Sequence, residues 1–139
     1  MKPTIAFLLK GYQEKTTTVS EVLQTSRELM DAGDPAIWIQ KGDRSGLQKF
    51  LDPLESPESQ PLFGIPFAVK DNIDVAGLPT TAGCPDYKYF PSEHATVVAR
   101  LVRAGAIPVG KTNLDQFATG LVGTRSPYGV PGNAFDPDY

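Results

Sequence analysis

The pattern that decides the fold of this chain is GIPFAVKDN at residues 64–72. Its apolar run from Ile65 to Val69 is typical of a buried strand, and the run ends at Lys70. We therefore expect Lys70 at the end of a sheet strand, with its ammonium group largely removed from solvent. Such a lysine either lays its stem along the core and pairs with a carboxylate such as Asp71, or loses its proton near neutral pH and acts as a base. The spacing of the residues leaves both roles open.

Segments that favour helices and strands alternate before this run. The best marked is a helix over 18–32, because Thr18 and Glu21 have the spacing of a capping box and Gly33 can end the helix. The other expected segments are a strand over 36–40, a weaker helix over 41–51 and an exposed, proline-rich connector over 52–61.

The same alternation continues through the run and beyond it, which predicts an α/β fold with parallel neighbouring strands. Lys111 and Asn113 follow one of these strands, where functional residues are often found, although an ion-paired lysine beside a capped helix start is the simpler interpretation. The expected segments are a strand over 63–69, an ordered loop over 77–91, a helix from Ser92 to Ala104, a strand over 106–109, a short helix over 114–120 and a Gly- and Pro-rich tail from residue 123.

The composition disfavours several classes of function. The formal net charge of −3, from 13 basic and 16 acidic residues, offers no electrostatic case for binding nucleic acid or a membrane surface. One cysteine, Cys84, cannot close an internal disulfide, and one histidine, His94, cannot complete a Cys/His metal cluster. The apolar run from Ile5 to Leu9 is too short for a signal peptide. We therefore expect a reducing, cytoplasmic setting, no metal and no cofactor.

The spacing of a phosphate-binding P-loop occurs at residues 105–112, GAIPVGKT. A P-loop needs a strand before its first glycine and flexible backbone between the two glycines. In this chain a helix is expected before Gly105, and the residues between the glycines are themselves the apolar strand, with Pro108 lacking an N–H group. We therefore expect this segment to bind neither ATP nor phosphate.

Four blocks, in order along the chain, resemble the opening of the amidase-signature domain. They are residues 64–72, Gly77–Gly83, Ala104–Ala106 and Gly110–Asn113. Residues 114–120 and 123–131 resemble the allophanate hydrolases within that family. The resemblance covers residues 62–139, whereas residues 1–61 resemble the variable helical entry that precedes the domain. It implies a mixed sheet flanked by helices.

The chain departs from the family pattern at two positions. His94 stands where an acidic residue is more common, and Gly132 stands where an arginine or another polar residue is common. We therefore expect helix capping and the anchoring of the tail to differ from those of relatives.

The resemblance also implies a mechanism. Amidase-signature enzymes use a Ser–cis-Ser–Lys triad, and Lys70 matches the catalytic lysine. Both serines are expected beyond Tyr139, since the tail carries no sign of a natural end, so the 139-residue chain is predicted to be inactive. Gly120, Leu121, Val122 and Gly123 match a segment that lines the acyl side of the pocket in the family, although a glycine turn that only reverses the chain fits them equally.

The substrate implied by the resemblance is allophanate, a ureido-carboxylate, which the complete enzyme would hydrolyse to ammonia and carbon dioxide. A biotin-dependent urea carboxylase would supply it, and many relatives are homodimers. The alternative is a non-catalytic, amidase-like scaffold or small-acid binding module that has lost its serines.

Overall fold

A three-stranded mixed sheet forms the centre of the computed structural model, which describes residues 3–136. The strand order is β1 (Trp38–Lys41), β3 (Ile107–Thr112), β2 (Pro66–Lys70), so β3 is central. β3 runs parallel to β2 and antiparallel to β1. This arrangement confirms the expected α/β class with a mixed sheet.

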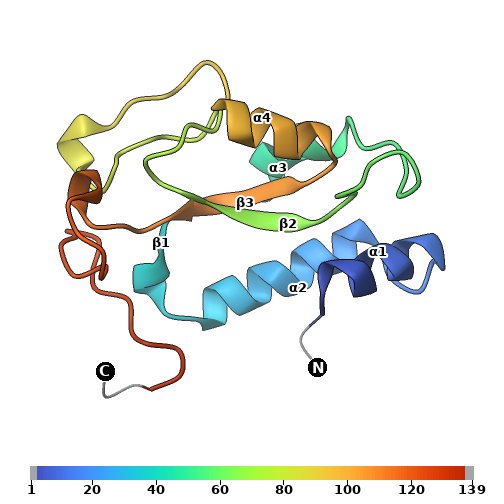
Figure 1. Ribbon diagram of the computed structural model, residues 1–139, viewed down its shortest axis with the longest axis horizontal. Coiled ribbons are helices and arrows are strands. Elements are labelled where there is room, and N and C mark those ends of the chain that lie inside the picture. The colour runs from blue at the N-terminus through green and yellow to red at the C-terminus, as the bar shows by residue number, and fades with distance from the viewer. Residues whose placement is uncertain (1–2, 137–139) are drawn as a thin grey trace.

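Helices lie on both sides of the sheet, as Figure 1 shows. One side carries α1 and α2, and the other carries α3 and α4. Among residues 3–136 the helices are α1 (Ile5–Gln13), α2 (Val19–Ala32), α3 (Arg44–Leu51) and α4 (Thr96–Arg103), and the short 3-10 turns are η1 (Pro35–Ile37), η2 (Pro85–Tyr87) and η3 (Gln116–Ala118).

The capping box predicted for the first long helix is present. The Thr18 hydroxyl accepts a hydrogen bond from the Glu21 N–H at 3.2 Å, and the Glu21 carboxylate accepts one from the Thr18 N–H at 2.8 Å. Two N–H groups that the first turn of a helix leaves unpaired are satisfied in this way. The helix before it, α1, was not predicted, although Thr4 caps it by accepting a hydrogen bond from the Phe7 N–H.

Two predicted helices differ in the structure. The helix expected from Ser92 begins only at Thr96, because Ala95 precedes it with a non-helical backbone and donates its N–H to the Asp74 carbonyl. The helix expected over 114–120 is wrong, since only the turn η3 forms there. Phe117 and Ala118 have φ of 52° and 56°, a left-handed conformation that an α-helix of L-residues does not contain.

The core lies where the helices meet the sheet. Val75 and Ile107 have no exposed surface and Val98 is 1% exposed. Other buried members of this cluster are Met30, Phe50, Val69, Leu78 and Val109. Trp38 packs against the same cluster from β1, so this strand before residue 61 and the two strands after it share one core.

The segment with P-loop spacing is a strand, as expected. Gly105 ends α4 with φ of 94°, and a Cβ added there would lie 2.9 Å from the Phe63 Cα, which only glycine avoids. Gly110 lies in the centre of the sheet, where a Cβ would meet the Gln40 carbonyl oxygen at 2.6 Å. Both glycines therefore serve packing, while the absence of phosphate binding stays a prediction.

Within residues 3–136, no helix has the length and apolar character needed to cross a membrane.

Candidate functional site

Lys70 is the last residue of β2, as predicted, but its side chain is exposed. The expectation of a desolvated ammonium group is therefore wrong for this structure. β2 is an edge strand, and side chains along it alternate between its two faces. Val69 is 4% exposed and faces the core, whereas Ala68 and Lys70 are exposed. The apolar run thus predicted the strand correctly, but the prediction that Lys70 lies on its buried face was wrong.

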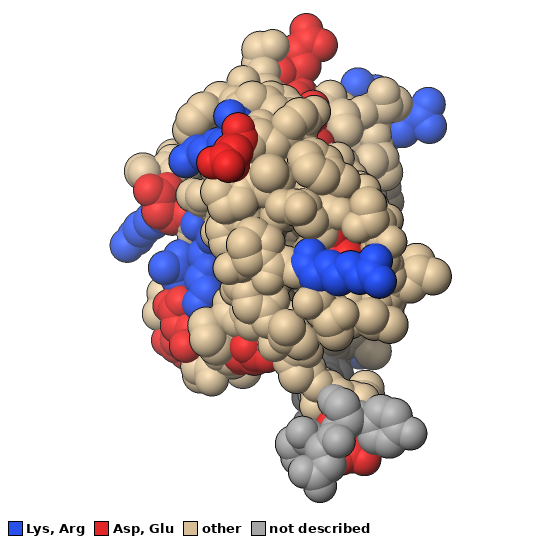
Figure 2. All heavy atoms as spheres, turned by 90° about the vertical axis from the view of Figure 1, so that its left-hand side faces the viewer, with Lys and Arg blue, Asp and Glu red and all other residues tan. Residues whose placement is uncertain are grey.

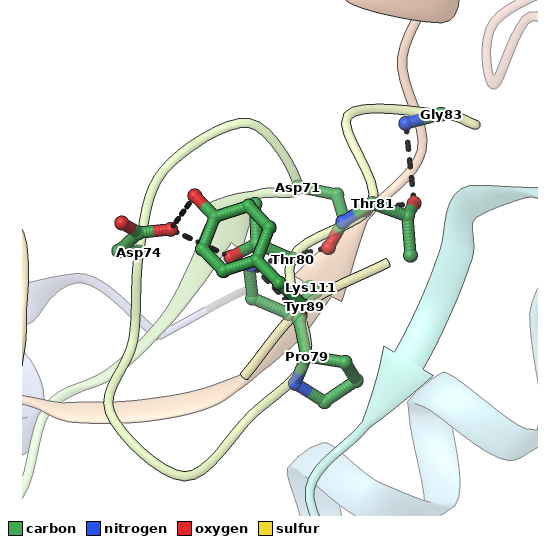
Figure 3. Close-up of polar contacts among 8 residues, drawn as sticks. All are labelled: Asp71, Asp74, Pro79, Thr80, Thr81, Gly83, Tyr89 and Lys111. Atoms are coloured by element: carbon green, nitrogen blue, oxygen red, sulfur yellow. Dashed lines mark hydrogen bonds and ion pairs between the residues drawn. The ribbon is translucent and has the colours of Figure 1, made fainter. Parts of the chain in front are cut away.

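Asp71 pairs with Lys111 rather than with Lys70. The Lys111 Nζ lies 3.0 Å from the Asp71 Oδ1, and both side chains are fully buried. Figure 3 shows the two residues meeting beyond the end of β2. Within residues 3–136 the Lys70 ammonium group has neither a hydrogen bond nor an ion pair. The structure thus excludes the Lys70–Asp71 pairing that the sequence left open, and it confirms the ion-paired interpretation of Lys111.

Further polar contacts satisfy this buried pair. Lys111 Nζ donates to the Pro79 carbonyl and to the Thr80 hydroxyl, each at 3.1 Å. The Asp71 Oδ2 accepts hydrogen bonds from the Thr81 N–H and the Thr81 hydroxyl, so Oδ1 is left to the ammonium group. Removing two charges from water costs several kcal/mol per ion unless such donors and acceptors compensate, which is why the loop wraps closely around the pair.

A second carboxylate continues this polar network to the surface. The Asp74 Oδ1 accepts hydrogen bonds from the Thr80 hydroxyl at 2.8 Å and the Tyr89 hydroxyl at 2.7 Å (Figure 3). The hydrogen bond to Asp74, with a smaller contribution from burial, raises the pKa of Tyr89 to about 12. Backbone bonds between Thr80 and Tyr89 close the loop on itself. The expected ordered loop over 77–91 is thus confirmed.

Asp115, which the sequence analysis overlooked, organises the predicted pocket segment. Its Oδ2 accepts from the N–H groups of Val122 and Gly123 at 3.1 and 3.0 Å, and its Oδ1 accepts from the Arg125 N–H at 2.7 Å. These backbone donors, with Arg125 first, lower the pKa of Asp115. Leu121 is 99% exposed. The signal that could have revealed this anchor is an acidic residue shortly before a glycine-rich stretch.

Asn113 ties three segments together instead of capping a helix. Its Nδ2 donates to the carbonyls of Ala36 and Gly129, at 2.9 and 3.0 Å, and its Oδ1 accepts from the Ser126 hydroxyl. The tail is further anchored by the Gly132 N–H, which donates to an Asp34 oxygen at 2.8 Å. This contact uses the backbone N–H of Gly132, so it needs no polar side chain at that position.

His94 also lies outside any helix cap. Its Nδ1 accepts a hydrogen bond from the Ala76 N–H at 3.0 Å, and its ring packs beside Phe50. Burial, with a smaller effect of the Lys49 charge, lowers the pKa of His94. The neutral ring therefore links the loop that follows β2 to the residues just before α4.

The lysine end of β2 and the pocket segment are joined through the loop between them. The Asp71 carbonyl accepts from the Ala82 N–H at 3.2 Å, and the Ala82 carbonyl accepts from the Phe117 N–H at 2.8 Å. Phe117 lies two residues after Asp115, which holds residues 122–125. Two backbone hydrogen bonds, both made by Ala82, therefore link Asp71 to Phe117 in the turn after Asp115.

The end of the molecule that carries these loops has few charges at its centre (Figure 2). Tyr87, at this end, makes edge-to-face contacts with Tyr89 and Phe117, with ring centroids 5.6 and 5.3 Å apart. Among residues 3–136 no group of three or more acidic, histidine or cysteine side chains is placed to hold a metal ion. A groove of about 640 Å³ lies between α2 and α3, and neither Lys70 nor residues 120–123 line it.

Protonation of Asp115 should release the pocket segment. Because its pKa is lowered, the carboxylate stabilises the fold above the pKa of an unfolded aspartate, about 3.9, and this contribution disappears as the pH falls through the lower folded value. We expect the amide resonances of Val122, Gly123 and Arg125 to titrate together, with a midpoint below 3.9. Asp115→Asn should abolish this shared titration in NMR spectra, and separate midpoints for the three amides would contradict the assignment.

The match to a family model and to solved structures places this α/β fold among the amidase-type domains. The chain belongs to the amidase family, whose model, Amidase, matches residues 47–139. It is 48% identical over 132 residues to a urea amidolyase of Saccharomyces cerevisiae, covering 90% of this chain and 7% of that protein. A urea amidolyase of Lachancea kluyveri is 59% identical over 99 residues, covering 69% of this chain and 5% of that protein.

Nearly the whole of this chain superposes on part of a solved relative. An allophanate hydrolase of Kluyveromyces lactis superposes with a TM-score of 0.82 and 42% identity, covering 99% of this chain and 23% of that chain. The chain thus spans less than a quarter of that hydrolase and less than a tenth of the two urea amidolyases.

Proposed function

We propose that this chain forms the N-terminal part of the amidase domain of an allophanate hydrolase, in which Lys70 is the base of a Ser–cis-Ser–Lys triad. The observation that carries the proposal is that, within residues 3–136, the Lys70 ammonium group has no partner, while Asp71, its neighbour in sequence, is already neutralised by Lys111. A lysine base must reach its neutral form, and a carboxylate paired with it would oppose that. Family membership and the names of the similar proteins support the same activity.

The proposed chemistry needs two serines supplied by sequence beyond Tyr139. Neutral Lys70 takes a proton from the bridging cis-serine, which in turn deprotonates the nucleophilic serine. The nucleophile attacks the amide carbon of the substrate, and backbone N–H groups hold the oxyanion that forms. When the intermediate collapses, the C–N bond breaks and ammonia leaves with the proton that the Ser–Lys relay took up. Water then hydrolyses the acyl-enzyme, and the unstable carbamate that is released breaks down to ammonia and carbon dioxide. A cytoplasmic location, a biotin-dependent urea carboxylase as the source of substrate and a homodimer belong to the same proposal.

The exposed side chain of Lys70 favours one competing function. A lysine that stays in water keeps its proton at neutral pH, as it would in a non-catalytic scaffold that binds a partner or a small acid. The two functions differ in what they require of the rest of the domain. The enzyme needs residues that cover the free edge of β2 and desolvate Lys70, whereas the scaffold needs none.

A fusion enzyme tests the proposal. Residues 1–139 would replace the corresponding 23% of the Kluyveromyces lactis allophanate hydrolase, joined where the structural match ends. We expect this fusion enzyme to release ammonia from allophanate and to act far more slowly on a simple aliphatic amide such as propionamide. Circular dichroism and gel filtration establish that it is folded. A folded fusion enzyme that releases no ammonia from allophanate would favour the scaffold.

A further inference from the structure

We infer that the buried pair of Asp71 and Lys111 positions Lys70 for its role as a base, so that both are positioning residues of the hydrolase. This inference rests on the proposed function and adds two residues to it. The pair does not touch the reacting atoms. It acts through the backbone of β2 and through the loop packed over the ends of β2 and β3.

The alternation of side chains along β2 provides the first step. Val69 and Asp71 are two residues apart and both are buried, at 4% and 0% exposure, so their side chains lie on the same side of the strand. Lys111 lies opposite Val69 on β3 and reaches Asp71 from there. Lys70, between these two residues, must therefore point to the other side. The ion pair sets the direction in which Lys70 leaves the strand.

Backbone bonds on both sides of Lys70 fix its main chain as well. The Asp71 N–H donates to the Thr112 carbonyl at 3.0 Å, which extends the β2–β3 ladder one residue past the strand. The Lys70 carbonyl accepts from the Ile73 N–H at 2.9 Å, which closes a turn. With the side chain of Asp71 held by Thr81 and Lys111, the residue after Lys70 is fixed through its N–H, carbonyl and carboxylate groups.

The charge of Lys111 has a second consequence. It neutralises the carboxylate nearest to Lys70 in sequence, and full burial leaves this interaction unscreened by water or salt. Without Lys111, Asp71 would carry an uncompensated negative charge one residue from Lys70, and that charge would favour the protonated form of Lys70. Position and charge are therefore controlled by the same pair. A purely structural ion pair would stabilise the domain without affecting the base.

The test separates positioning from stability in the fusion enzyme. The double substitution Lys111→Met with Asp71→Leu replaces the pair by apolar side chains of similar size, so no unpaired charge stays buried, although the Thr81 N–H and the Pro79 carbonyl lose their partners. We expect its Tm to lie between those of the parent and of Lys111→Met, and its KM for allophanate to be unaltered. Its kcat should fall about 100-fold, the loss expected when a reacting group is misplaced by about 1 Å.

The matched control is Tyr12→Phe, which removes a buried hydrogen bond from the tyrosine hydroxyl to the Gly64 carbonyl at the other end of β2. We expect this variant to lower the Tm without changing kcat. A double variant with the kcat of the parent would overturn the positioning role. If the double variant loses both Tm and kcat, the single variant Lys111→Met decides between the two explanations. A kcat that falls with Tm as it does in Tyr12→Phe also overturns the positioning role. A kcat well below that trend supports the positioning role.

These outcomes are distinct from failure of the proposed function. If the parent fusion enzyme hydrolyses allophanate and Lys70→Ala abolishes this, the function stands whatever the double variant does. If Lys70→Ala leaves activity intact, the proposed function fails before the pair is tested.

Discussion

Lys70→Ala is expected to lower kcat for allophanate at least about 10⁴-fold in the fusion enzyme, because a triad member whose removal stops proton transfer typically costs several powers of ten. Lys70→Arg should be as inactive as the alanine variant. Arginine keeps the positive charge but remains protonated, so it cannot accept a proton from the cis-serine. The measurement is the initial rate of ammonia release at saturating allophanate. The 139-residue chain by itself should release no ammonia, since the proposed mechanism takes both serines of the triad from outside it.

The matched control is Lys10→Ala on α1. Lys10 is also an exposed lysine, with a side chain 70% exposed, and its ammonium lies 3.6 Å from Glu14. Its loss should leave kcat unchanged. If Lys70→Arg retained activity, Lys70 would serve as a fixed positive charge, and the proposed mechanism would be wrong.

Lys111→Met is expected to destabilise the 139-residue chain by about 3–5 kcal/mol, the cost of leaving one partner of a buried ion pair unpaired. Asp71 would then be a carboxylate with no exposed surface and no cation beside it. The free energy of unfolding, measured in urea, checks this value. A protein of this size has about 5–15 kcal/mol in total, so the variant should be partly unfolded at 37 °C.

The double variant Lys111→Met with Asp71→Leu controls for the loss of packing. It should recover part of the lost stability, because no charge then remains buried, although Thr81 and Pro79 lose their hydrogen-bond partners. Lys10→Ala should change the free energy of unfolding far less, since its ion pair with Glu14 is exposed to water. A Lys111→Met variant as stable as the parent would mean that Asp71 is solvated or protonated in the folded chain.

Local signals in the sequence were sufficient for much of the fold. Thr18 and Glu21 predicted α2, and short apolar runs predicted all three strands, because capping and burial depend on residues close together in the chain. The helix expected over 114–120 failed for the opposite reason. The carboxylate of Asp115 accepts backbone N–H groups as far away as Arg125, and the intervening chain turns back on itself at Phe117.

For the site, the sequence by itself determined that Lys70 ends a strand and that the chain resembles an amidase-signature enzyme. Only the tertiary structure decided which lysine Asp71 binds, since Lys70 is its neighbour in sequence and Lys111 lies 40 residues further along. The choice follows from the parallel pairing of β2 with β3, which brings Lys111 opposite Val69. Strand alternation then turns Asp71 toward Lys111 and Lys70 away from both.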